Sequence, residues 1–200
     1  MIYYPKSYEN FAACPADLDI ASYLEEREGG LKIFHFGTGR HHHVGLSNHK
    51  RIRPNVIIAI TASPQEYLRY IELCVRDGSL GRNYLVYFGD IYNLRSEYLP
   101  RLDIVSLPHL GEYHDPTKAL EADIIPPGVK PDRSRYAPLD DRSLLDLVVG
   151  KLVPGGRLLI YTGSHGAGVT RQLLLEEISH KQRLAYSTTH GSIAVYAKVN

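Results

Sequence analysis

Residues 31–39 read LKIFHFGTG and give the first indication of the fold. Its first six residues form a mostly apolar run, which predicts a strand buried inside a sheet. Gly37 and Gly39 follow directly, where the chain must turn tightly and its backbone can approach a ligand. A glycine at such a turn is also common for purely structural reasons, so the surrounding sequence must decide between the two interpretations.

Strand-like and helix-like segments alternate on both sides of this glycine loop. Further buried strands are predicted at residues 56–60, 84–88, 104–107 and 157–161. Helices are predicted at residues 16–26, 41–50 (a weak candidate), 63–77, 140–152 and 169–179. Such alternation indicates a parallel sheet with helices on its faces. Two β-rich runs at 182–187 and 192–198, joined at His190-Gly191, predict an antiparallel hairpin at one edge.

The 200 residues suffice for one domain with a core of its own. We expect residues 1–30 to form an N-terminal lead-in and residues 31–200 to form the domain. The Pro-rich, weakly periodic segment 108–139 is expected to be a loop or lid insertion, and Pro154-Gly155-Gly156 is expected to turn the chain into the strand at 157–161.

Composition excludes several classes of function. The net charge is only +1, so there is no electrostatic reason to expect nucleic acid or an anionic membrane as a partner. The N-terminus lacks the apolar core of a signal peptide, and no apolar run approaches the length of a membrane span. The two cysteines form neither a disulfide framework nor a zinc pattern. A cytoplasmic protein is expected, and a homodimer is left open.

Four local matches carry a resemblance to a known superfamily. They are the glycine loop with its strand (33–39), the second strand with its Ser-Pro helix start (56–64), Phe88-Gly89-Asp90-Ile91 after the third strand, and the helix, Pro-Gly-Gly and strand at 145–160. In this order and spacing they are similar to the class I S-adenosylmethionine-dependent methyltransferases. The resemblance covers residues 31–200.

The resemblance implies a Rossmann-like three-layer α/β sandwich with a seven-stranded, mostly parallel sheet and an antiparallel C-terminal hairpin. It implies S-adenosylmethionine as the cofactor, lying across the carboxyl ends of the strands, where open parallel sheets bind ligands in general. The expected cofactor-binding residues are His35, Gly37, Thr38, Gly39, His41, Thr61, Ser63, Gly89, Asp90, Ile91 and Leu107. An alternative for Asp90 is a helix N-cap.

Two of these motifs depart from the superfamily pattern, at three positions. Its first motif normally begins with a carboxylate and has a third glycine, where this chain has His35 and His41. Its second strand normally ends in a carboxylate that holds the ribose hydroxyls, where this chain has Thr61. Three interpretations stay open: other groups hold the cofactor, the ligand differs, or the domain is a catalytically silent binding or scaffold protein. An NAD enzyme fits less well, because position 42 is His42 and no acid ends the second strand.

Histidines give two further hypotheses. One short region is rich in histidine: His35, the run 41–43 and His49. Consecutive side chains point in different directions, so they seldom bind the same metal ion. A His-metal enzyme is therefore the less favoured alternative, and no metal ligands are predicted. His109 and His114 follow the fourth strand, where superfamily members often place groups facing the methyl acceptor. We predict these two as catalytic residues that orient or deprotonate an oxygen or nitrogen of a small-molecule acceptor.

Overall fold

The computed structural model describes residues 14–61, 63–89, 91–108, 139–161 and 168–199 of the chain. Seven strands in this part form one sheet in the order β3-β2-β1-β4-β5-β7-β6. The strands are β1 (Lys32–Phe36), β2 (Val56–Thr61), β3 (Tyr84–Phe88), β4 (Leu102–Leu107), β5 (Leu152–Tyr161), β6 (Leu184–His190) and β7 (Ile193–Lys198). The first five run parallel, and β7 is antiparallel to both β5 and β6. The predicted fold class is confirmed.

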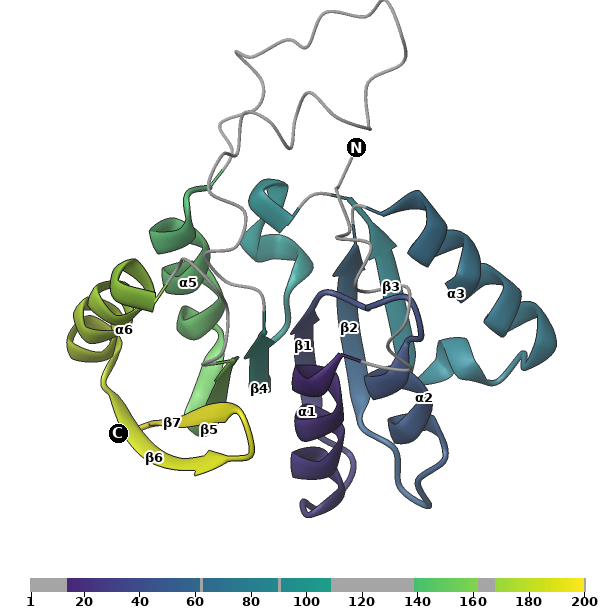
Figure 1. Cartoon of the computed structure of the whole chain (residues 1–200), viewed down its shortest axis with the longest axis horizontal. Helices are drawn as coiled ribbons and strands as arrows, with labels where there is room; N and C mark the ends of the chain where they lie inside the picture. Colours follow the sequence, from purple (N-terminus) through teal and green to yellow (C-terminus); the bar gives the residue numbers. More distant parts are fainter. Residues whose placement is uncertain (1–13, 62, 90, 109–138, 162–167, 200) are drawn as a thin grey trace, which may run out of the picture.

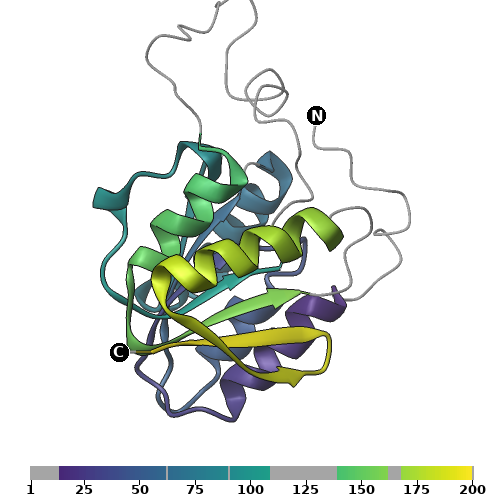
Figure 2. The same cartoon turned by 90° about the vertical axis from the view of Figure 1, so that its left-hand side faces the viewer.

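Helices cover both faces of this sheet, which makes three layers (Figures 1 and 2). One face carries α1 (Pro15–Glu25), α2 (His43–His49) and α3 (Pro64–Arg76), and the other carries α5 (Asp141–Gly150) and α6 (Gly168–Gln182). Short 3-10 helices lie at Leu80–Arg82, Ile91–Asn93 and Ser96–Tyr98. None of the helices in the described ranges is long and apolar enough to cross a membrane.

The period-2 alternation of the strands divides the core into two apolar clusters. Phe34 and Phe36 of β1 face α5 and α6, whereas Ile33, the residue before Phe34, faces α1 and α2. Burial on both faces explains why β1 and β2 read as continuous apolar runs rather than alternating ones. His35 points to the same face as Ile33, so it enters the layer beneath α1.

The Pro-Gly-Gly stretch differs from its prediction. Pro154, Gly155 and Gly156 lie inside β5, which begins at Leu152, and they do not form a turn before it. The register with β4 shifts there, from Leu102↔Leu152 to Ile104↔Arg157, which is an irregularity of the β-bulge type. Gly155 has φ 78°, a conformation that glycine adopts without strain. The correction is therefore a bulge where a turn was expected.

Helix α3 buries a different stripe from the one that its apolar spacing suggests. Leu68 and Val75 are 63% and 81% exposed, although they recur at helical intervals. The side chains that face the sheet are Glu66, Tyr67, Tyr70, Leu73 and Cys74. The Ser63-Pro64 start was predicted correctly, since the Ser63 hydroxyl accepts a hydrogen bond from the Glu66 backbone N–H.

Candidate functional site: the glycine loop and the polar layer beneath it

The sheet places the glycine loop at a topological switch point. Strands β1 and β4 are neighbours, but the chain goes from β1 to α2 on one face, while α5 follows β4 on the opposite face. The helices that follow these neighbouring strands therefore lie on opposite faces of the sheet (Figure 1). Open α/β sheets bind ligands in the crevice that this divergence creates.

The loop itself consists of a threonine between two glycines with positive φ. Gly37 has φ 86° and Gly39 has φ 58°, and neither has a Cβ that would cover the backbone. The Gly37 N–H continues the ladder to β2 by donating to the Ile60 carbonyl at 3.3 Å. Thr38 is buried, with 1% of its surface exposed. The loop thus presents two residues without a Cβ at the carboxyl ends of the strands.

A buried carboxyl group lies directly behind this loop. Glu66, in the first turn of α3, is 4% exposed, and its Oε2 accepts hydrogen bonds from two hydroxyl groups. The Thr38 hydroxyl donates at 2.7 Å and the Thr61 hydroxyl at 2.6 Å. Thr61 ends β2, so the carboxyl group that the strand end lacks is present in the same place, carried by the following helix.

His35 has a similar relation to an acid on another helix. Its Nδ1 lies 3.2 Å from the Ser106 hydroxyl of β4, and its Nε2 lies 3.9 Å from Oδ1 of Asp17 in α1. Asp17 is 4% exposed. It also closely approaches the glycine loop, because a Cβ on Gly39 would lie 2.8 Å from its Oδ2. Both strand ends that depart from the superfamily pattern therefore have a buried carboxyl group within 4 Å.

His42 completes the polar layer. It has φ 49°, precedes α2 directly and is fully buried. Its Nε2 lies 2.8 Å from the Glu66 carbonyl oxygen, which can only accept, so we assign the proton to Nε2. The Tyr84 hydroxyl, 2.9 Å from Nδ1, then donates to that nitrogen. Burial lowers the pKa of His42 and, together with the Asp17 charge, raises the pKa of Tyr84, so both groups are neutral at pH 7.

The other predicted cofactor residues are dispersed around this layer. Ser63 is buried and caps α3, and His41 is exposed on the surface. Ile91 and Leu107 pack in the apolar cluster under α5. Gly89 follows β3, and its N–H donates to the Thr61 carbonyl at 2.9 Å. Three predicted residues lie outside the described ranges, namely Asp90, His109 and His114.

Sequence reasoning missed Asp17, Glu66 and the role of His42. Glu66 stands three residues after Ser63, which is the spacing of a capping box, and that spacing marks it as a residue near the loop. Its side chain turns to the two threonines instead of capping the helix. Asp17 carries no local signal, because its role depends on where α1 packs.

No metal site is found among the described side chains around the histidine-rich region. Within the described residues, no three His, Cys, Asp or Glu side chains converge on one point. His49, for example, lies 2.9 Å from Asp77 and 3.1 Å from the Asn83 side-chain oxygen, away from the loop.

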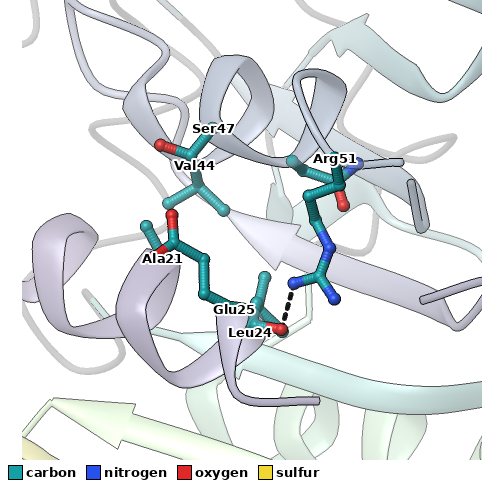
Figure 3. A pocket seen from close by; sticks show the side chains of 7 residues that line it. Ala21, Leu24, Glu25, Val44, Ser47 and Arg51 are labelled. Carbon is teal, nitrogen blue, oxygen red and sulfur yellow. Dashed lines mark hydrogen bonds between the residues drawn. The ribbon is translucent and has the colours of Figure 1, made fainter. Parts of the chain in front are cut away.

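Two concave places on the described part of the surface lie apart from the loop. In the crease between α1 and α2 (Figure 3), the Arg51 guanidinium donates to the Leu24 carbonyl, and no room is left for a water molecule. A groove of about 250 Å³ lies at the amino ends of β1 and β4, lined among others by Arg27, Asp103 and Arg157.

Solved structures share this architecture. A SAM-dependent methyltransferase from Aquifex aeolicus superposes with a TM-score of 0.60 over 99% of this chain and 100% of that one, at 14% identity. The fold is that of class I S-adenosylmethionine-dependent methyltransferases. A precorrin-6y C5,15-methyltransferase from Geobacter metallireducens gives 0.61 at 13% identity, covering 99% and 94% of the two chains.

The methyltransferase fold is not confined to enzymes named for methyl transfer. The [4+2]-cyclase SpnF matches with a TM-score of 0.52 at 16% identity, over 83% of this chain and 56% of that one. No family model matches the sequence, and no curated protein is similar to it in sequence. The function must therefore be argued from the site.

Proposed function

We propose that this chain is an S-adenosylmethionine-dependent methyltransferase that acts on an oxygen or nitrogen of a small molecule. One observation carries the proposal. The glycine loop at the switch point lies beside two buried carboxyl groups, Glu66 and Asp17, which are close to Thr61 and His35, the two positions where the superfamily pattern has a carboxylate and this chain has none. Carboxyl groups so close to the loop favour a ligand that carries a positive charge, such as a sulfonium, because an ionised carboxyl group attracts a cation, while Glu66 keeps its own hydrogen bonds from Thr38 and Thr61.

The residues of the site have different tasks. Gly37 leaves space for the adenosyl group against the main chain, and the missing side chain of Gly39 makes room for the Asp17 carboxyl group. Thr38, Thr61 and Glu66 fix the loop's shape. When bound, the cofactor supplies a methyl group that is already activated on sulfur. The protein's remaining tasks are to align the acceptor and to remove one proton from it.

His109 and His114 are the proposed groups for that second task. Histidine titrates near neutrality and suits a base that unmasks an oxygen or nitrogen nucleophile. If one of them acts so, its replacement by alanine lowers turnover about 100-fold, the low end of what general-base catalysis contributes. Unchanged turnover in both His109→Ala and His114→Ala would remove them from the mechanism.

A small-molecule acceptor is favoured by the near-neutral charge of the chain, +1 over 200 residues. An RNA acceptor is the alternative. It is suggested by structural neighbours such as TrmN from Thermus thermophilus and a putative rRNA-methylase from Clostridium thermocellum. The test is transfer of tritium from methyl-labelled S-adenosylmethionine to a panel of phenols, carboxylic acids and amines, with transfer RNA and ribosomal RNA alongside. Labelling of small molecules supports the proposal. Labelling of RNA alone, or of nothing, contradicts it.

A further inference from the structure

The glycine loop has a conformational hinge on each side of one anchored residue. The positive φ values of Gly37 and Gly39 lie in a region that glycine enters freely, so neither residue makes the loop stiff. Thr38 stands between them and is 1% exposed. Whatever holds Thr38 therefore determines the shape of the loop that faces the cofactor.

Glu66 holds this loop at two points. Its Oε2 accepts the Thr38 hydroxyl at 2.7 Å, in the middle of the loop. Its backbone carbonyl accepts the His42 Nε2–H at 2.8 Å, at the residue where the loop ends and α2 begins. The same Oε2 accepts the Thr61 hydroxyl at 2.6 Å, which fastens the arrangement to the end of β2.

The chemistry of this position argues against a purely structural role. Burying a carboxyl group costs free energy that an apolar side chain of similar size would not cost. The buried carboxyl group of Glu66 accepts a hydrogen bond from the loop that lies where open α/β sheets bind ligands. A loop ordered before binding loses less conformational entropy when the ligand arrives, so its affinity is higher.

We infer that Glu66 is the positioning residue of the cofactor loop: it pre-orders Gly37-Thr38-Gly39 for the adenosyl cofactor through the hydroxyls of Thr38 and Thr61. This inference rests on the proposed function. The inference also explains Thr61, which stands where the superfamily has a carboxylate. Its hydroxyl connects the end of β2 to Glu66, so Thr61 does not have to bind the ribose by itself.

The test uses pairs of variants that differ in one hydroxyl. Thr38→Val and Thr61→Val keep the side-chain shape and remove the donor, whereas Thr38→Ser and Thr61→Ser keep the donor. Glu66→Gln keeps an oxygen that accepts from both hydroxyls. Tyr70→Phe is the control on the same helix, because it removes the buried hydrogen bond from Tyr70 to the Tyr84 carbonyl without touching the loop.

Two measurements are made on each full-length variant. Hydrogen–deuterium exchange of residues 37–42 in the ligand-free protein reports the order of the loop, and calorimetry with S-adenosylhomocysteine reports affinity. Both valine variants should exchange faster in the loop and bind about tenfold more weakly, as expected for loss of one buried hydrogen bond. The serine variants, Glu66→Gln and Tyr70→Phe should stay within about threefold of the wild-type affinity.

The outcomes separate this inference from the proposed function. Wild-type protein that binds no S-adenosylhomocysteine contradicts the proposed function and the cofactor part of the inference, while loop exchange still decides whether Glu66 orders the loop. Valine variants that bind like wild type with unchanged loop exchange overturn the positioning role. A loss of affinity in Glu66→Gln as large as in Thr38→Val, with normal loop exchange, overturns it in favour of direct contact between Glu66 and the ligand.

Discussion

Replacing Gly45 by alanine tests the packing that supports the polar layer. Gly45 lies in α2, and its missing side chain makes room for the fully buried ring of Tyr84. A Cβ added there would lie 2.4 Å from Cε1 and 2.5 Å from both Cδ1 and Cζ of that ring. Tyr70 and His42 pack against the ring at centroid distances of 5.6 and 5.8 Å, and this packing limits its retreat.

Two opposing effects set the magnitude of this change. Alanine is favoured over glycine inside a helix by about 1 kcal/mol. Against this, overpacking a rigid core costs about 1–3 kcal/mol, and a shortfall of about 1 Å from ordinary contact places this site at the upper end. We therefore expect Gly45→Ala to lower the free energy of unfolding by about 1–2 kcal/mol.

Urea unfolding at pH 7.5 measures the difference. The matched control is Gly150→Ala at the end of α5, where an added Cβ meets nothing within 4 Å, so that variant should be as stable as wild type or slightly more. Gly45→Ala with wild-type or higher stability would refute the packing of Tyr84 against α2.

The remaining predictions concern pH, capping, the hairpin and ligand linkage. Burial lowers the pKa of His42 below 6.5, so on acidification His42 takes up a proton in the unfolded chain before it does so in the folded protein. The stabilisation present above pH 6.5 is therefore lost as pH falls towards the folded-state pKa, by up to about 1.4 kcal/mol per pH unit. An unfolding free energy that stays constant in urea titrations from pH 7.5 to 5.5 would contradict this. Asp140→Ala removes the acceptor for the Ser143 N–H at 2.7 Å and should cost about 1 kcal/mol in the same assay, with Asp140→Asn near wild type. Gly191→Ala should lower the melting temperature by several degrees, because φ is 56° and the new Cβ would lie 2.5 Å from the Asp19 carboxyl group; an unchanged value argues against this contact. S-adenosylhomocysteine at 100 times its Kd should add about 2.7 kcal/mol to the unfolding free energy, and no shift at any concentration contradicts binding to the folded state.

Local sequence patterns predicted the sheet but only part of the site. The apolar runs at 31–36 and 56–60 and the glycines after β1 carry their information within a few residues, so β1, β2 and the tight turn after β1 were predicted correctly. The hairpin was predicted for the same reason, because Gly191 marks the turn between two β-rich runs.

What the sequence did not reveal depends on packing between distant segments. Asp17 reaches the loop only because α1 lies over β1, and Tyr84 reaches His42 across 42 residues. The side-chain stripe that α3 buries could not be chosen from periodicity either, since Leu68 and Tyr70 both belong to series with helical spacing. Tertiary packing selected the series with Tyr70.

The most direct measurement is a titration of isotope-labelled protein with S-adenosylhomocysteine, followed through amide NMR shifts. We expect saturable shifts centred on Gly37, Thr38 and Gly39, with smaller changes at Thr61 and Gly89. Absence of shifts, or shifts confined to the groove beside Gly155 and Arg157 at the amino ends of the strands, would contradict a cofactor bound at the glycine loop.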